Sequence, residues 1–115
     1  MKRDQAYFFD IAEAARLAVS YVEKTTREAF LSDTKSQDSV IRRLEIIGEA
    51  AKRISEETRN AHPDLPWKEM IGMRNFLIHD YDDIDIHIVW STVTKDLPDL
   101  LSKMERAGIA EFYDP

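Results

Sequence analysis

The chain has no cysteine among its 115 residues, and only three glycines and four prolines. The absence of cysteine excludes disulfides, thiolate metal sites and cysteine nucleophiles, and it makes a reducing cytoplasm the simplest location. The glycines are scattered, so the chain has no glycine-rich loop that could cradle phosphate. No apolar run reaches the roughly 18 residues of a membrane-spanning helix, and residues 1–5 lack the apolar core of a signal peptide.

Acidic side chains outnumber basic ones, 22 against 16, which gives a formal net charge of −6 at pH 7. Residues 1–79 contain 13 acidic and 13 basic side chains, whereas residues 80–115 contain 9 acidic and 3 basic. A protein that binds nucleic acid broadly usually has a basic surplus, so composition argues against that role. It allows a small basic pocket on a neutral surface, and it suggests that the acidic end faces a basic partner protein.

Length and helical periodicity predict an all-α domain that covers residues 1–115. The hydrophobic content of 43% and charged content of 33% are ordinary for a soluble globular protein of one domain. The first helix is predicted from about Asp4 to Lys24, with a wide apolar face whose alanines permit close helix–helix approach. Thr26 is a candidate cap for a short helix that continues through Leu31.

A second long helix is predicted to begin after Asp33, a candidate cap, and to run to about Asn60. Its inner stripe consists of Val40, Leu44, Ile47, Ala51 and Ile54. Glu49 and Arg53, four residues apart, should form a surface pair. Four basic residues of this helix could line a groove, but a solvated charged face is the favoured interpretation: Arg42, Arg43, Lys52 and Arg53.

Pro63 and Pro66 separate the second helix from a third, because proline cannot continue a helix interior. After the third helix, alternating isoleucines from Ile84 are typical of a strand, but a longer apolar repeat at helical spacing favours a fourth helix. That repeat consists of Ile86, Trp90, Val93, Leu97, Leu100 and Met104. Asp83 or Asp85 is its candidate cap. The short connections then predict an up-and-down antiparallel bundle of four main helices plus one short helix.

Two further features shape the fourth helix. Pro98 is expected either to bend it or to mark the first turn of a continuation. Gly108 follows Ala107 at the expected end of the helix, and the tail to Pro115 is expected to be frayed or bound to a partner.

The third helix carries the stretch from Met73 to Tyr81, which combines an arginine, a histidine and a tyrosine among apolar neighbours. Arginine is a strong phosphate-binding group, and histidine titrates near neutral pH. On a helical wheel Arg74 falls in an otherwise apolar stripe with Trp67, Met70, Ile71, Leu77, Ile78 and Tyr81. A guanidinium there either pairs with a carboxylate at the edge of the core or binds an anionic ligand through an opening to solvent.

Arg74 and His79 are five residues apart, so on an unbroken helix they point about 140° away from each other and lie ~7.5 Å apart along the axis. They cannot readily converge on one ligand in that geometry, whereas Asn75 and His79 share a face. Two arrangements resolve the conflict. The helix ends near His79, or a second copy of the chain supplies the missing half of the site, and we expect both.

Arg74-Asn75, three further residues and His79-Asp80-Tyr81 resemble the Arg-x4-His-x-Tyr signature of HEPN-domain ribonucleases. More narrowly, the chain is similar to the HepT-like toxins of prokaryotic toxin–antitoxin pairs. The similarity covers most of the chain, and its order makes it more specific than the six-residue motif alone. Other segments that fit are residues 37–51, Pro66-Trp67, residues 71–75, residues 90–93 and residues 96–98.

This resemblance implies a metal-independent endoribonuclease that acts as a homodimer without a cofactor. RNA supplies its own nucleophile, the ribose 2′-hydroxyl. His79 would transfer protons, Arg74 would hold the phosphoryl oxygens, and Asn75 would orient the imidazole or the phosphate. Two His79 residues across a two-fold axis would provide base and acid. Without the resemblance, a lone histidine near a helix end would more often be structural.

The resemblance also gives Tyr81 a regulatory role. HepT-like toxins of the HEPN/MNT pairs, type VII toxin–antitoxin systems, are inhibited when a minimal nucleotidyltransferase antitoxin transfers AMP to the motif tyrosine. AMP would plug the cleft and place negative charge beside the phosphate-binding groups. Otherwise Tyr81 simply packs. The alternative function is a non-catalytic helical module that helps such a transferase hold its substrate.

A divalent metal is a further hypothesis. The motif is followed by aspartates and a second histidine, namely His79, Asp80, Asp82, Asp83, Asp85 and His87. Oxygen and imidazole ligands suit several divalent ions. Aspartates clustered before a helix are usually caps and solvated turns, however, so no metal is expected in this site.

Overall fold

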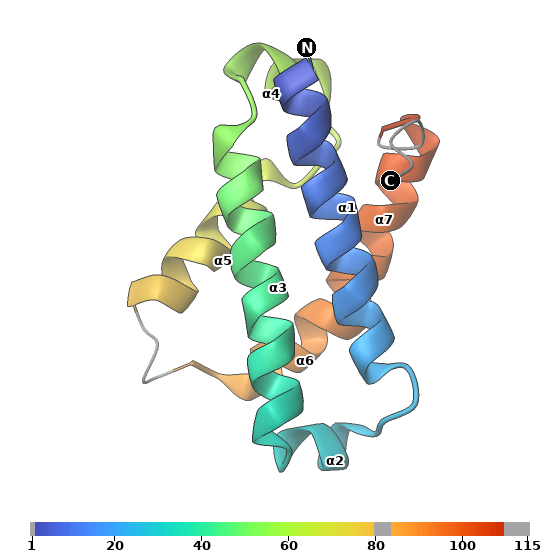
Figure 1. The fold of residues 1–115 in the computed structure, drawn as a ribbon, viewed down its shortest axis with the longest axis vertical. Helices are drawn as coiled ribbons and strands as arrows, with labels where there is room; N and C mark the ends of the chain where they lie inside the picture. The colour runs from blue at the N-terminus through green and yellow to red at the C-terminus, as the bar shows by residue number, and fades with distance from the viewer. Residues whose placement is uncertain (1, 80–83, 110–115) are drawn as a thin grey trace.

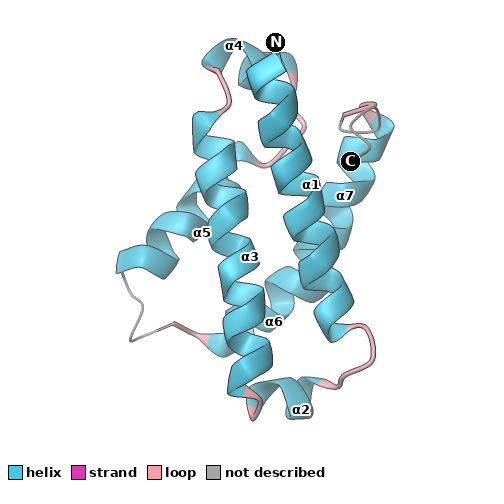
Figure 2. Ribbon diagram, viewed as in Figure 1, coloured by secondary structure: helices cyan, strands magenta, loops and turns pink. Residues whose placement is uncertain are grey.

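The computed structural model of the chain describes residues 2–79 and 84–109, and leaves out the side chains of Lys2, Arg74 and residues 76–79. The elements in chain order are α1 (Lys2–Val22), α2 (Arg27–Leu31), α3 (Thr34–Arg53), α4 (Glu56–Ala61), α5 (Trp67–His79), α6 (Ile86–Ser91), the π-helical turn η2 (Thr92–Asp96) and α7 (Leu97–Arg106). Within these ranges the chain forms helices and connecting loops, and no strand (Figure 2).

The long elements run alternately up and down (Figure 1). α1 and α3 lie side by side and antiparallel, joined through α2 at one end of the molecule. α5 packs on α3, and α6, η2 and α7 follow one another without a break and return against α1. The predicted all-α, up-and-down bundle is therefore confirmed, with α4 as an additional short helix.

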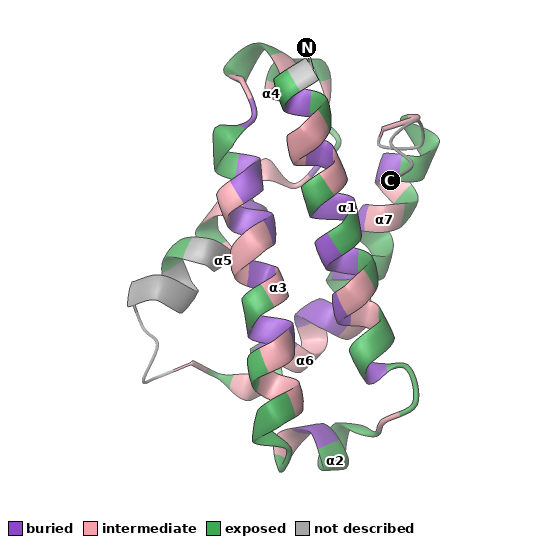
Figure 3. Ribbon diagram, in the orientation of Figure 1, coloured by how far each residue is buried: buried purple, intermediate pink, exposed green. Residues whose placement is uncertain are grey.

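The core lies between α1 and the other long elements (Figure 3). Four of the five alanines of α1, namely Ala12, Ala14, Ala15 and Ala18, are almost completely buried, which allows the neighbouring helices to approach closely. Phe30 of α2 is fully buried and closes one end of the core against Trp90, with ring centroids 5.2 Å apart. No helix in the described ranges is both long and apolar enough to span a membrane.

Local sequence signals place the start of several helices as predicted. Thr26 Oγ1 accepts a hydrogen bond from the Ala29 amide at 3.1 Å and caps α2. Asp33 Oδ1 accepts from the Ser36 amide at 3.2 Å and caps α3. These side chains satisfy amides that have no partner within the first turn of a helix.

The prediction that the second long helix runs to about Asn60 is wrong. α3 ends at Arg53, Ile54 is extended (φ −67°, ψ 137°), and α4 begins at Glu56. The break buries the Ile54 side chain, and it lets Ser55 Oγ cap α4 by accepting from the Thr58 amide at 3.2 Å. Tertiary contacts thus override the continuous helical pattern.

Asp4 of α1 holds this break in place. Its Oδ1 accepts from the Ser55 amide at 3.1 Å, and its Oδ2 accepts from the hydroxyls of Ser55 at 2.7 Å and Thr58 at 2.6 Å. Burial raises the pKa of Asp4, but the hydrogen bonds from Thr58 and Ser55 together outweigh it, so the pKa lies below its ordinary value. The buried carboxylate is therefore satisfied in its charged form.

The last helical stretch confirms the prediction of helix rather than strand. Asp85 Oδ1 caps α6 by accepting from the His87 amide at 2.9 Å. The π-helical turn η2 precedes Pro98, which falls in the first turn of α7, where its missing N–H is tolerated. α7 ends at Arg106, and Gly108 has a left-handed φ of 69°.

Candidate functional site

The start of α5 is fixed by aromatic packing and by a hydrogen bond to the preceding loop. The Trp67 indole donates to the His62 carbonyl at 2.9 Å. The Phe8 ring of α1 lies 5.9 Å from the Trp67 ring and 5.8 Å from the His62 ring, centroid to centroid. Pro66 occupies the position before the helix, where the absence of an N–H is harmless. This anchor sets the register of the whole motif helix.

α5 continues unbroken to His79, so its register can be read through the motif. Positions 74 and 79 lie about 140° apart around the helix, as expected from their spacing. α5 is described as far as His79 and residues 80–83 lie outside the described residues, so the prediction that the helix ends near His79 remains a prediction. The side chains of Arg74 and His79 fall outside the described part of the chain, as does all of Tyr81, so their assigned roles remain predictions.

The two sides of α5 differ in burial. Met70 is buried, and Trp67, Ile71 and Met73 are half-buried, which marks the side that packs on the core. By register, position 74 belongs to this packed side, and position 79 lies on the other side together with Gly72 and Asn75. Gly72 and Asn75 are both exposed. One chain therefore divides the motif between two sides of one helix.

Gly72 is the residue at this site that sequence reasoning missed. A β-carbon built at position 72 would meet no atom within 4 Å. Packing within the described chain therefore does not require a glycine in the exposed middle of α5, although glycine weakens a helix relative to alanine. The only signal in the sequence is a glycine inside a helical pattern, which by itself indicates neither packing nor function.

The acidic cluster after the motif is only partly described. Asp80, Asp82 and Asp83 fall outside the described residues. Asp85 serves as the cap of α6, and His87 Nδ1 lies 2.8 Å from Arg27 Nη2 of α2. The described residues contain no group of three or more side chains that could hold a metal ion. The geometry of these two side chains favours their structural roles.

Two of the four basic residues of α3 that could line a groove, Arg42 and Arg53, are exposed and lie close to carboxylates. Arg53 lies 2.7 Å from Glu49, as predicted, and hydrogen bonds with Tyr7 and with Glu49 raise its pKa above the ordinary range. Arg42 lies 3.8 Å from Glu45. Arg42 and Arg53 line a recess of about 210 Å³ between α1 and α3, together with these carboxylates. This arrangement favours the predicted solvated charged face over an RNA groove.

Comparison with known proteins supports the resemblance. The family described as "Ribonuclease HepT-like" matches residues 11–107, which include the whole of α5 and positions 74–81. A "Probable ribonuclease HepT" from Thermococcus cleftensis is 46% identical over 107 residues, which cover 92% of this chain and 97% of the relative.

Two further relatives carry the printed designation "Putative RNase". One, from Methanocaldococcus jannaschii, is 39% identical over 105 residues, which cover 90% of this chain and 96% of the relative. The other, from Caldanaerobacter subterraneus, is 37% identical over 100 residues, which cover 87% of this chain and 89% of the relative. No solved structure matches the chain. Because both the family match and these identities extend over most of its length, the chain belongs to the HepT-like ribonuclease family.

Proposed function

We propose that this protein is a metal-independent endoribonuclease and the toxin of a type VII HEPN/MNT toxin–antitoxin pair. The observation that carries the proposal is the Arg74-x4-His79-x-Tyr81 motif, with positions 74 to 79 on one continuous helix, in a chain of this ribonuclease family. Residues 1–115 would act as one domain in the cytoplasm, which agrees with the absence of cysteine.

The proposed reaction uses the RNA as its own nucleophile. A neutral His79 accepts the proton of a ribose 2′-hydroxyl, the 2′-oxygen attacks the adjacent phosphorus, and the bond to the 5′-oxygen breaks. A protonated His79 of the second copy donates a proton to that leaving oxygen. Arg74 binds the non-bridging phosphoryl oxygens and stabilises the transition-state charge, and Asn75 orients the imidazole or the phosphate.

The active form is proposed to be a homodimer. The unbroken α5 separates positions 74 and 79, so one copy alone would form a poor site. Gly72 supports this proposal because it is exposed, no described atom outside its own helix backbone lies within 4 Å of its β-carbon position, and another backbone or an RNA strand could approach closely. Sedimentation that finds only monomer at micromolar concentration would contradict the composite site.

Two single variants test catalysis. His79→Ala removes both the base and the acid of the homodimer, each usually worth about 10²–10⁴-fold, and should abolish measurable RNA cleavage. Arg74→Ala should have the same effect by removing charge stabilisation. Both should relieve growth arrest on expression while circular dichroism shows unchanged helical content. If EDTA abolishes wild-type cleavage and Mn²⁺ or Mg²⁺ restores it, the metal-independent mechanism is wrong.

Mixing the two inactive variants tests how the copies share the site. If Arg74 of one copy works with one His79 of the other, each mixed dimer contains one intact site. Random exchange should then restore about a quarter of wild-type activity, because half of the dimers are mixed and each has one intact site of two. If both His79 residues are required, the mixture stays inactive. If RNA cleavage recovered although sedimentation showed no dimers and no exchange of subunits, both arrangements would be contradicted.

Tyr81 is the proposed site of regulation by AMP transfer. A phosphodiester-linked AMP would add negative charge close to the groups that bind RNA phosphate, and so block cleavage without unfolding the domain. The test is incubation with the cognate minimal nucleotidyltransferase, ATP and Mg²⁺, followed by intact mass and peptide mapping. Added AMP on Tyr81 with loss of cleavage supports the proposal, and Tyr81→Phe should escape inhibition. An active transferase that modifies only other residues would refute it.

A further inference from the structure

A groove lies on the surface between α5 and α7, which do not pack closely against each other. α5 packs on α3, and α7 packs on α1, so that α5 and α7 make few contacts with each other (Figure 1). The groove has a volume of about 330 Å³, within the range of roughly 300–1,000 Å³ usual for binding pockets. Its apolar lining consists of Leu44 and Ile47 of α3, Met70 and Met73 of α5, and Leu97 and Leu100 of α7.

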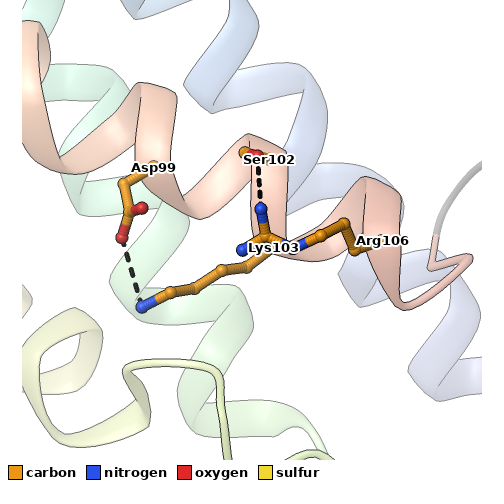
Figure 4. A network of polar contacts seen from close by, with 4 residues as sticks. All are labelled: Asp99, Ser102, Lys103 and Arg106. Atoms are coloured by element: carbon orange, nitrogen blue, oxygen red, sulfur yellow. Dashed lines mark hydrogen bonds and ion pairs between the residues drawn. The ribbon is translucent and has the colours of Figure 1, made fainter.

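The rim of this groove is acidic. Glu69, Asp96 and Asp99 line it and are exposed, and Lys103 is the only basic side chain among the lining residues that the structure describes. Lys103 Nζ lies 3.2 Å from Asp99 Oδ2, so these two charges offset each other (Figure 4). Glu69 and Asp96 form no ion pair in the described part of the chain. Among the described side chains, the groove therefore combines apolar walls with two negative charges that form no ion pair.

Arg106, the next cation along α7, does not reduce this charge. Its Nη1 donates to Ser102 Oγ at 3.1 Å, and it is not part of the groove lining (Figure 4). The groove also differs from the recess between α1 and α3, where arginines are paired with carboxylates. An occupant of the groove has to match apolar walls and negative rim charges together.

The charges argue against three simple occupants. A second copy related by a two-fold axis would bring the same carboxylates face to face, and like charges opposed across an interface cost several kcal/mol. RNA phosphate would be repelled by the rim. The segments of the chain outside the description, residues 80–83 and 110–115, contain acidic side chains and no basic ones, so they do not complement it either.

We propose that the groove binds an amphipathic helix of a partner protein, with apolar anchor side chains flanked by lysine or arginine. The α5 wall extends from Pro66 to Met73, about two turns or ~10.5 Å of helix. That length suits apolar anchors at positions i, i+3 or i+4, and i+7, the pattern of helices that bind hydrophobic grooves. The two free carboxylates select basic flanks and exclude acidic ones. This proposal does not depend on RNA cleavage.

The methionines provide natural probes of this site. Met70 and Met73 line the groove, whereas Met104 is buried in the core and does not. Protein labelled with ¹³C at the methionine methyl groups is titrated with two helical peptides that share leucine anchors and differ only in lysine or glutamate flanks. The lysine peptide should shift the Met70 and Met73 signals at concentrations that leave the Met104 signal unchanged. It should bind at least tenfold more tightly than the glutamate peptide.

Charge reversal then tests the rim. Glu69→Lys and Asp96→Lys should each weaken the lysine peptide about three- to tenfold, with the effect decreasing as salt is added. Glu105→Lys is the matched control, since Glu105 is an exposed acid on α7 that does not line the groove, and it should leave affinity unchanged. Circular dichroism confirms that each variant is folded.

Several results would overturn the proposal. Equal affinity for both peptides would identify a purely apolar pocket, and equal loss with Glu105→Lys would indicate only a general effect of net charge. Signals of Met70 and Met73 that depend on protein concentration, with dimers in sedimentation, would mean that a second copy covers the groove. Shifts of these signals on adding RNA would assign the groove to RNA binding instead.

Discussion

Replacing Gly72 by alanine is expected to stabilise the protein, although the residue lies two positions before the motif arginine. Gly72 is in the interior of α5 and exposed, and the added methyl group would meet no atom within 4 Å. The substitution therefore removes the unfolded-state entropy and helix penalty of glycine without a steric cost. That difference is about 0.8–1.0 kcal/mol in a helix interior.

Gly108→Ala provides a control of opposite sign. Gly108 follows α7 with a φ of 69°, a left-handed conformation that costs a residue with a β-carbon about 1–2 kcal/mol. The same chemical change should thus stabilise the protein at one position and destabilise it at the other. Urea unfolding followed by circular dichroism measures both, and Gly72→Ala should raise Tm by about 4 °C in a domain of this size.

The reasoning on Gly72 would be refuted if Gly72→Ala destabilised the isolated chain at low concentration. If a second copy or RNA approaches this surface, a larger side chain should interfere with it specifically. Gly72→Leu should then retain the fold but lose dimerisation or RNA cleavage. Sedimentation separates these losses, because only the first changes the oligomeric state.

The remaining predictions concern the core and its polar contacts. Asp4→Asn should destabilise the fold by about 1–3 kcal/mol at pH 7, whereas the exposed Asp38→Asn should have little effect. Because the folded pKa of Asp4 is lowered, its stabilising effect is complete above its ordinary pKa of about 3.9 and is lost as pH falls through the folded value. The urea midpoints of wild type and Asp4→Asn should therefore converge at low pH, and a constant difference would contradict this linkage. Phe30→Ala should cost about 3–5 kcal/mol, since Phe30 is fully buried against Trp90. Gln37→Ala should cost about 1 kcal/mol, because its amide donates to two carbonyls at the end of α2; the same unfolding assay measures both, and losses below about 0.3 kcal/mol would show that these contacts contribute little.

Helix starts were predictable because their determinants are local. Thr26, Asp33 and Asp85 each accept from an amide two or three residues further along the chain. Spacing in the sequence alone reveals such contacts. For Pro98 the sequence left two alternatives, a bend or the first turn of a continuing helix, and the structure has the second.

The break after α3 was not predictable in this way. It depends on Asp4, which is 51 residues before Ser55 and reaches it only because α1 and α3 lie antiparallel. Ser55 is a local capping signal beside Ile54, but the apolar stripe that continues through Ile54 favoured an unbroken helix. A polar group that is satisfied across the fold can therefore end a helix whose own pattern continues.

For the candidate site, too, the sequence predicts local geometry but not the contacts that complete it. The register of α5 follows from the sequence, because five residues on a helix always separate positions 74 and 79 in the same way. In the proposed homodimer, completion of the site depends on the surface of a second copy, and no spacing within one chain can encode that geometry. α5 packs on α3, its Met70 is buried, and Gly72 and Asn75 are exposed. A continuous helix keeps positions 74 and 79 about 140° apart, so the proposed activity requires a second surface beside the exposed side of α5.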